Sequence, residues 1–468
     1  MKKRLSTLTL DQWDGRYRQL KRNGLKEPSW GGSLRRHLRD NDQRLRRLRF
    51  DPSPAALHLW NFLLTEEDRL RQARADGRMI VGVMKDLGTV PVMAYALSNV
   101  VAFYPDGAWW IPCLMEQQED CLALADSLGV TETFCPVRAM LGAFLNEAHF
   151  PSPDLLICSA GATCDDFSAI VQRLEGLGRI VHWWEIPYRR PPVKGEKRVL
   201  LPGGAAAPAS LVAAVRAELQ RIRRLLAERS GQSLDDAVLS AGIRRANRVR
   251  HLLGELRRQV FGAPQTPLPA LEMLIAEMLA IHFCSDFAGT ERVLKGLLRE
   301  VKCRVREGKG FQETDAARIF WVNPVADLRV MNLAEAAGGR ICGTDYMFTH
   351  ALDTIPVELP PMEALARMAL SDPMAGLSKD RAARIARDVQ VYGAEAVVIS
   401  RIPGASHCAS EGRMIGGILQ GTLDLPVIEI EAPSISDSLA PHLRTRLEAL
   451  VETVKQRRLL QEPQRRKT

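Results

Sequence analysis

The chain has 468 residues, of which 46 % are hydrophobic and 25 % charged, and its net charge is +9. This length exceeds one ordinary core and predicts two or three domains, and the composition is typical of a globular protein. No run of about eighteen apolar residues occurs, which argues against a membrane-spanning helix. The basic N-terminus lacks the apolar stretch of a signal peptide, so we expect a cytoplasmic protein.

The cysteines and the basic residues narrow the possible partners. Nine cysteines are too sparse for a disulfide scaffold, so we expect reduced thiols or metal ligands. The positive charge is concentrated in residues 35–49, 216–258 and 455–467. A net positive charge favours binding of nucleic acid, of a polyanionic cofactor ester or of an acidic partner protein. No recognisable nucleic-acid-binding module accompanies it, and solvated basic faces are the plainer interpretation.

The first part of the chain changes character near residue 76. Residues 1–75 predict a basic helical N-terminal arm. The β-branched run Met79–Met84 then opens a region where short apolar runs, such as Asp154–Cys158 and Arg179–Trp184, alternate with helical patterns. This alternation predicts an α/β domain with a doubly wound parallel sheet over residues 76–205.

A second α/β domain follows a helical region. After the Pro-, Gly- and Ala-rich break Pro202–Pro208, residues 206–312 have almost no strand pattern and predict a helical linker domain. Strand patterns return from Ala317 and predict a second domain over residues 313–434, and residues 435–468 predict a C-terminal helix and basic tail. The predicted fold class is thus α/β. It has two doubly wound, flavodoxin- or Rossmann-like parallel-sheet domains that look like a weak duplication, with a helical insertion between them and an N-terminal helical arm.

One cysteine lies where a strand is predicted to turn into a helix. The segment Pro153–Phe167 predicts a buried strand, a small-residue turn and a helix start, with Cys164 at the junction. Asp165 and Asp166 follow it, and carboxylates favour the first turn of a helix. Helix N–H groups and the positive end of the helix dipole favour the thiolate, which is the form that binds metal.

Two further cysteines are predicted at similar junctions. Pro136 suits the first position of a helix and places Cys135 at its cap, while Cys408 follows a strand predicted to end at Ser400. We expect all three cysteines just past the carboxyl ends of parallel strands, where open α/β sheets bind ligands, and hence in the cleft between the domains. Three thiolates there require a positive partner, such as Zn²⁺ or an iron–sulfur cluster. Their spacing matches neither a zinc finger nor a ferredoxin.

The remaining cysteines are interpreted as core residues or bystanders, because unpaired cysteine usually behaves as a small buried hydrophobe. They are Cys113, Cys121, Cys158, Cys284, Cys303 and Cys342. Cys113 and Cys121 flank residues 114–120, which we expect near the cleft.

The cysteine segments also carry a resemblance to a known family. The segments concerned are, in chain order, Phe134–Gly142, Asp154–Ile157, Cys164-Asp165, Ser233–Arg250, Ser406–Cys408, Gly416–Leu419 and Asp424–Ile430. Together they resemble the 2-hydroxyacyl-CoA dehydratase D-component family, which includes the catalytic subunits of ATP-dependent benzoyl-CoA reductases. The resemblance covers roughly residues 75–460.

The resemblance implies an iron–sulfur enzyme of anaerobic metabolism. It implies a [4Fe-4S] cluster on Cys135, Cys164 and Cys408, with the fourth iron left to water, another small ligand or substrate. A CoA thioester would receive single low-potential electrons and form a ketyl-type radical that loses a proton and hydroxyl; in the aromatic branch the ring is reduced. The implied partners are an ATP-hydrolysing iron–sulfur activator and a second homologous subunit or a second copy of the chain. We expect neither a membrane nor a nucleic-acid partner.

Three other residues are candidates for the chemistry. His407, beside Cys408, is a candidate to donate a proton or bond a cluster sulfur, although a loop histidine on solvent is the plainer interpretation. Glu116 is a candidate general acid or base, and a position on a solvated helix face is the alternative interpretation. Arg138, one turn after Cys135, is a candidate to balance cluster charge or bind a CoA phosphate, and a plain ion pair is the alternative.

Two alternative functions stay open at this point. The segment Trp109–Cys113 and the Arg-rich arm depart from the family's pattern. Cys113 and Cys121 leave open a branch with an [8Fe-9S] double-cubane cluster that reduces small substrates. A metal-free basic scaffold or nucleic-acid-binding protein is the alternative from another class.

Overall fold

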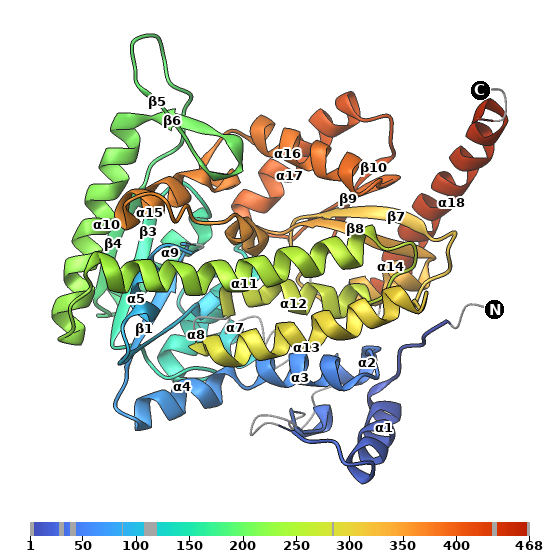
Figure 1. The fold of residues 1–468 in the computed structure, drawn as a ribbon, viewed down its shortest axis with the longest axis horizontal. Coiled ribbons are helices and arrows are strands. Elements are labelled where there is room, and N and C mark those ends of the chain that lie inside the picture. The colour runs from blue at the N-terminus through green and yellow to red at the C-terminus, as the bar shows by residue number, and fades with distance from the viewer. Residues whose placement is uncertain are drawn as a thin grey trace.

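The computed structural model describes residues 4–27, 32–37, 44–86, 88–106, 119–282, 285–432 and 438–465. Two four-stranded parallel sheets organise these residues (Figure 1). The first sheet has the order β2 (Val100–Phe103), β1 (Met79–Met84), β3 (Leu155–Gly161), β4 (Val181–Ile186). The second has the order β10 (Val427–Glu431), β9 (Ala396–Arg401), β7 (Ala317–Val322), β8 (Gly339–Asp345). The predicted α/β class with two parallel sheets is confirmed.

Both sheets have the same strand order. Counted along each half of the chain, the strands lie in the order 2-1-3-4. Chain direction across the sheet therefore reverses between β1 and β3 and again between β7 and β9. Such a switch point opens a crevice at the carboxyl ends of the strands, where ligands of open α/β sheets bind. The shared order supports the duplication that the sequence suggested.

The helices surround the sheets and fill the space between them (Figure 1). The N-terminal part and first half contain α1 (Leu10–Arg22), η1 (Leu34–His37), α2 (Arg44–Arg47), α3 (Pro54–Leu64), α4 (Glu66–Ala75), α5 (Val90–Ala96), α7 (Glu119–Ser127), η2 (Pro136–Arg138), α8 (Ala139–Asn146) and α9 (Asp165–Gly176). The hairpin β5 (Arg198–Leu200), η3 (Pro202–Gly204), β6 (Ala206–Pro208) leads to α10 (Ala209–Ser230), α11 (Asp236–Gly262), α12 (Ala270–His282) and α13 (Phe287–Arg306). The second half contains α14 (Arg329–Ala336), η5 (Met347–Leu352), α15 (Pro361–Ser371), η6 (Pro373–Ala375), α16 (Ser378–Val391), α17 (Ser406–Thr422) and α18 (Ala440–Arg465).

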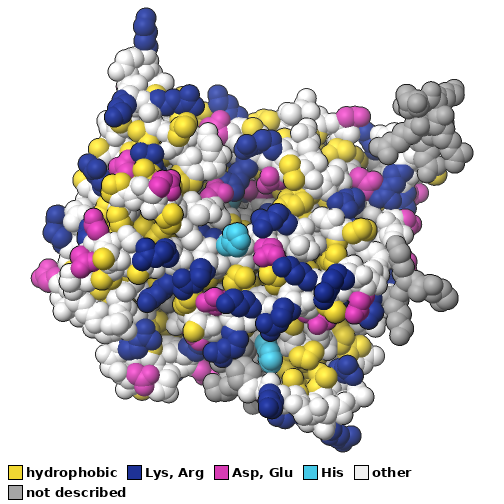
Figure 2. Space-filling model, in the orientation of Figure 1, with side chains coloured by type: hydrophobic (Ala, Val, Ile, Leu, Met, Phe, Trp, Pro, Cys, Tyr) yellow, Lys and Arg dark blue, Asp and Glu magenta, His cyan; other side chains and the backbone are white. Residues whose placement is uncertain are grey.

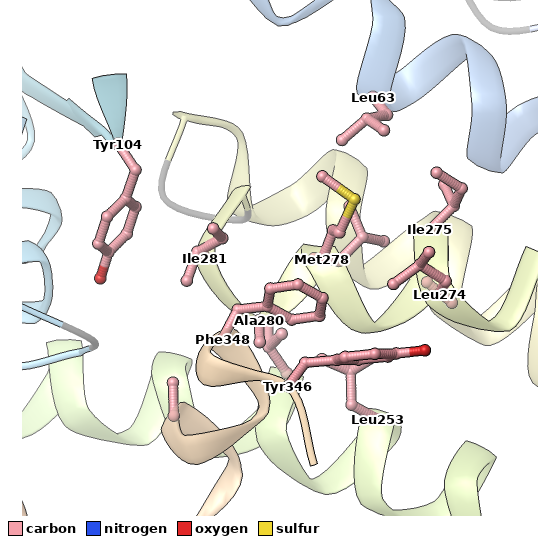
Figure 3. Close-up of a cluster of buried hydrophobic side chains, with 14 of the residues drawn as sticks. Leu63, Tyr104, Leu253, Leu274, Ile275, Met278, Ala280, Ile281, Tyr346 and Phe348 are labelled. Carbon is pink, nitrogen blue, oxygen red and sulfur yellow. The ribbon is translucent and has the colours of Figure 1, made fainter. Parts of the chain in front are cut away.

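Helix α12 lies at the centre of the hydrophobic core. It is apolar at nearly every position because neighbours surround it on all sides, unlike the one-sided pattern of a surface helix. Figure 3 shows Met278 of α12 between Leu63 of α3 and Phe348 of η5. Burying each such side chain contributes about 1.5–3 kcal/mol. This packing fixes η5, which reaches from the core to the cleft between the sheets.

The N-terminal segment is part of this core. Trp13 and Trp60 are fully buried, and the Trp60 ring packs edge-on against Phe50 with centroids 5.3 Å apart. Asp51 forms a buried ion pair with Arg304 of α13, whose Nη2 donates to the Asp51 carboxylate at 2.9 Å. The predicted basic arm therefore covers one side of the molecule, through apolar and ionic contacts with residues that are distant in the sequence.

Basic side chains form a band on one face. Figure 2 shows Lys and Arg side chains gathered over α11 and α13. Several are balanced locally, as where Lys295 contacts Glu291 at 2.6 Å. This matches the plainer interpretation of solvated basic faces. None of the described helices is both long and apolar enough to cross a membrane.

A buried carboxyl that contacts the start of α12 predicts a pH-dependent stability. Glu335 of α14 accepts a hydrogen bond from the N–H of Ala270, the first residue of α12, at 2.8 Å, and burial raises the pKa of Glu335 to about 7. The unfolded chain ionises this group near pH 4.5, so its stabilising effect is fully present below that pH and is lost as the pH rises through 7. Glu335→Gln keeps the acceptor and removes the charge. As the pH rises from 5 to 8, we expect the free energy of unfolding of this variant to increase relative to that of the wild type by up to about 3 kcal/mol.

Urea unfolding at both pH values measures this difference. Glu452→Gln, at an exposed position of α18, is the matched control and should follow the wild type. An unchanged pH dependence in Glu335→Gln would show that this carboxyl is already ionised in the folded protein.

Candidate functional site

Each switch point contains the same backbone feature. Lys85 directly follows β1 with φ 66°, and Asn323 directly follows β7 with φ 67°. Positive φ costs a residue other than glycine of the order of 1–3 kcal/mol, although Asn tolerates it better than most. Ser159 Oγ donates to the Lys85 carbonyl at 3.0 Å, and Ser400 Oγ lies 2.8 to 3.1 Å from the carbonyl oxygens of Val322, Asn323 and Pro324. A serine on the neighbouring strand therefore holds the turn in both halves.

The two carboxyl edges face one pocket with about 860 Å³ of empty space, part of it open to solvent. From the first half it is lined by Lys85, Asp106, Cys135, Val137, Thr163, Cys164, Asp166 and Phe167, and from α12 by Ile281. From the second half it is lined by Pro324, Met347, Phe348, Met374, Ile402 and Ala405. We call it the cysteine pocket. Its walls are mainly apolar, which lowers the local dielectric constant and strengthens the effect of each charge in it.

Cys164 and Cys135 both line the cysteine pocket at helix starts. Cys164 is the N-cap of α9, and its Sγ lies 3.6 Å from Asp166 Oδ2. Thr163, before it, has φ 86°, which is an outlier for a β-branched residue and marks a strained turn. Cys135 is the N-cap of η2, as Pro136 indicated. Two of the three predicted cysteines thus reach the same space.

The segment of the third cysteine touches the first. Cys408 lies in the first turn of α17; its side chain is outside the described part of the structure. Ala405, just before α17, lines the cysteine pocket. Gly404 has φ 77°, and a Cβ there would lie only 2.5 Å from the Phe134 carbonyl oxygen, so the loop before α17 rests on the backbone before Cys135. Helix α17 also contacts α9. The segments that carry the three cysteines therefore meet.

The expectation that every cysteine follows a parallel strand is wrong for Cys135. Cys164 follows β3 and Cys408 follows β9, but the element before Cys135 is helix α7. Gly129, with φ 83°, ends that helix, and residues 129–133 contain one apolar side chain, which is too few for a buried strand. Cys135 reaches the pocket from a loop beside the sheet.

The other cysteines lie away from the pocket lining where they are described. Cys158 is buried within β3 and Cys342 within β8, as expected of core residues. Cys121 was expected near the cleft, but it is buried in α7, with Gly142 of α8 packed against its backbone. Cys303 is half-buried on α13. Cys113 and Cys284 fall outside the described residues.

The other candidate residues are placed only in part. Glu116 and the side chain of His407 fall outside the described residues. Arg138 is buried, with its Nε 3.3 Å from an Asp126 carboxylate oxygen and its Nη1 3.4 Å from the Phe134 carbonyl oxygen. It contacts the segment before Cys135, but it is not among the residues that line the cysteine pocket.

Lys85 is a pocket residue that the sequence interpretation missed. Its Nζ donates to Ser168 Oγ at 2.8 Å and to the Gly161 carbonyl at 3.2 Å, on either side of Cys164 in the chain. Burial lowers the pKa of its ammonium, and Cys158, Asp165 and Cys164 oppose that shift. A lysine directly after an apolar strand was the available signal, because a charged residue there lies at the ligand-binding edge.

The second half has a buried ionic network below its switch point. Arg381 of α16 is fully buried, with its Nη1 2.8 Å from Glu411 of α17 and its Nη2 2.9 Å from Asn323. Its Nε also donates to Asp345, the last residue of β8, at 2.8 Å. Burial alone would raise the pKa of Asp345, but Arg381 and His350 hold it well below its usual range. Arg381 thereby joins the strained turn at Asn323 to the helix that carries Cys408.

Comparison with known proteins gives the family. The family model described as 2-hydroxyglutaryl-CoA dehydratase, D-component matches residues 92–454. The chain belongs to this family. No curated protein matches the chain. Membership makes it a dehydratase-type subunit and one component of a multi-component system, and it confirms the resemblance that the cysteine segments suggested.

The pocket of this D-component family member fits an iron–sulfur cluster in its donor chemistry. Two thiols line an apolar space, the backbone of a third cysteine follows three residues after the lining residue Ala405, and a buried ammonium is nearby to offset thiolate charge. Within the described side chains, no three His, Cys, Asp or Glu residues lie close enough to hold a metal ion. The Cys408 side chain falls outside that set.

The position of Lys85 predicts the reactivity of Cys164. In metal-free protein, we expect Lys85→Gln to slow alkylation of Cys164 by iodoacetamide roughly three- to tenfold, because the loss of a nearby cation reduces the thiolate fraction. Mass spectrometry of the Cys164 peptide measures the rate. Lys379→Gln, at an exposed position of α16, is the control and should leave the rate unchanged. Equal rates in all three proteins would remove Lys85 from the environment of Cys164.

Arg381 should be important for stability. Arg381→Met leaves Asp345 and Glu411 buried without their cation, and we expect a loss of about 3–5 kcal/mol in the free energy of unfolding. Arg387→Met, an exposed change on the same helix, should cost less than about 0.5 kcal/mol. Urea unfolding distinguishes the two. Similar losses in both variants would mean that the network does not stabilise the second half.

Proposed function

We propose that this chain is the iron–sulfur subunit of a 2-hydroxyacyl-CoA dehydratase or benzoyl-CoA reductase-type enzyme, with a [4Fe-4S] cluster on Cys135, Cys164 and Cys408. The observation that supports it best is the meeting of three cysteine segments at one pocket between two switch points. Family membership supports the dehydratase type. Cys121 is buried in α7 away from the lining, so nothing in its position favours the double-cubane alternative.

The proposed chemistry is reduction or dehydration of a CoA thioester with low-potential electrons from an ATP-hydrolysing activator. When bound, the cluster would supply an iron with an open coordination position, which acts as a Lewis acid toward a thioester carbonyl or a leaving hydroxyl. In this proposal the partners are the activator and a second homologous subunit or a second copy of this chain.

The pocket's own residues prepare this chemistry. Phe167 and Phe348 form apolar walls that exclude water from a reactive substrate. Lys85 places a fixed positive charge beside Cys164. Asp166, which lies next to the Cys164 thiol and lines the pocket, orients that thiol through its carboxylate. His407 and Glu116 remain our candidates for moving the substrate's proton.

Anaerobic iron and sulfide analysis tests the proposal. We expect about four irons per chain in the wild type, the content of one [4Fe-4S] cluster. Cys164→Ala and Cys408→Ala should each lose most of the iron and the visible absorbance, because each removes one of three protein ligands. EPR of the reduced protein reports the same loss.

Cys303→Ala is the matched control for these variants. Its thiol lies on α13 within reach of Glu307, away from the pocket lining, so iron content should not change. Iron-free wild-type protein from anaerobic preparation would contradict the proposal. About eight irons per chain would favour the double-cubane alternative instead.

A further inference from the structure

A second cavity lies on the other side of η6 from the cysteine pocket. It is bounded by the segment after β4, η3, η6 and α16, and encloses about 1120 Å³ of empty space, part of it open to solvent. We call it the α16 cleft. Pro373 of η6 lines the α16 cleft, and Met374, the next residue, lines the cysteine pocket. A wall of a single short turn therefore separates the two spaces.

Cations dominate the lining of the α16 cleft. They are Arg189, Arg190, Lys379, Arg381, Arg384 and Arg387, against one acidic lining residue, Asp380. Three of the cations already have carboxylate partners. Arg190 pairs with Glu196, Arg381 with Asp345 and Glu411, and Arg384 with Asp353.

The other three cations have no ion pair within the described part of the chain. They are Arg189, Lys379 and Arg387. Lys379 and Arg387 are exposed and lie eight residues apart on α16, with Ala383 between them on the same face of the helix and also in the lining. Their ammonium and guanidinium groups thus border one stretch of the cleft and are available to a bound anion.

Arg189 is the most constrained of the three. It is 6 % exposed, and its Nη1 donates to the carbonyl oxygens of Leu370 at 2.6 Å and Asp372 at 3.0 Å. Burial lowers the pKa of Arg189 and the neighbouring Arg384 cation lowers it further, while Asp372 and Asp380 oppose the shift. A buried cation without an ion pair is costly, and an anion in the cleft would offset that cost.

The backbone around the cleft also suits an oxyanion. Helix α16 starts at Ser378 with no side-chain cap, and its first residues line the cleft, so the positive end of its dipole lies beside it. Gly203 and Gly204 of η3 have φ 74° and 88° and lack side chains that would obstruct the opening. Arginine forks and helix N–H groups together are the usual ligands of phosphate groups.

We propose that the α16 cleft binds a diphosphate group. Two sources share this chemistry. One is a free diphosphate or nucleotide, bound as a separate ligand. The other is the diphosphate of a CoA thioester whose acyl end passes η6 into the cysteine pocket, and this second source rests on the function proposed above.

Isothermal titration of the full chain with pyrophosphate at 0.15 M salt, on the order of physiological ionic strength, tests the cleft. We expect saturable binding that weakens at least tenfold in the double variant Lys379→Gln/Arg387→Gln, because each lost charge-assisted contact is worth about a factor of ten or more. Both residues are exposed, so the fold should tolerate the change. Arg292→Gln/Arg299→Gln removes the same charge from exposed positions of α13 and should leave binding unchanged.

The source is decided by a second measurement. If the ligand is a CoA thioester, acetyl-CoA, which has no free thiol to consume iodoacetamide, binds more tightly than pyrophosphate and slows alkylation of Cys164, whereas pyrophosphate does not. If it is a separate ligand, pyrophosphate and ADP bind alike and acetyl-CoA leaves the alkylation rate unchanged. The proposal is overturned if pyrophosphate does not bind at millimolar concentration, or if the α13 control weakens binding as much as the α16 variant does. Neither result depends on iron, so failure here is separate from failure of the cluster.

Discussion

The site depends on the two serine-held turns at the switch points. Lys85 and Asn323 each leave a central strand in a left-handed conformation, and the hydroxyl of Ser159 or Ser400 lies within hydrogen-bonding distance of the carbonyl that this conformation presents. Each bond contributes about 1 kcal/mol, which is comparable to the strain it opposes. Each turn directs the chain away from the carboxyl edge of its own sheet. Both edges therefore stay open, and the pocket can form between them.

Packing far from the pocket keeps the two edges facing each other. Helix α12 is buried on all sides, and η5 packs against it with Phe348 extending from that core into the pocket lining. Ile281, near the end of α12, lines the same pocket. The pocket floor is thus an extension of the hydrophobic core, so its shape is as fixed as the core itself. This rigidity suits the cluster site proposed above, which would hold thiols at set positions.

Much of this arrangement could be predicted from the sequence because it is local. The strand of Met79–Met84 follows from its apolar run, and the N-cap position of Cys164 follows from the turn before it and the carboxylates after it. The path of Cys135 could not be predicted, since it depends on a loop that reaches the pocket from beside the sheet. The partners of Lys85 and Arg381 could not be predicted either. Both depend on residues between about 30 and 83 positions away in the chain.

The N-terminal segment shows the same limit. Its charged sequence predicted a basic helical arm but gave no partner for it, and the structure shows that Trp13 and Trp60 are fully buried and that Asp51 pairs with Arg304. Charge density along a segment says how its exposed face is solvated, but not which apolar residues between the charges reach a distant core. Only the tertiary contacts reveal that this segment closes the helical layer.

The duplicated halves have diverged in where they place positive charge. In the first half the residue at the strained turn is itself a cation, Lys85, and among the described residues its ammonium donates to two neutral groups, Ser168 and the Gly161 carbonyl. In the second half the turn residue is Asn323, and the cation beneath it, Arg381, is neutralised by Asp345 and Glu411. The cation of the first turn therefore lies in the pocket lining, where Asp106 and Asp166 also lie, whereas the cation of the second turn is paired with carboxylates below that turn. Through Glu411, the second pairing ties the turn at Asn323 to helix α17.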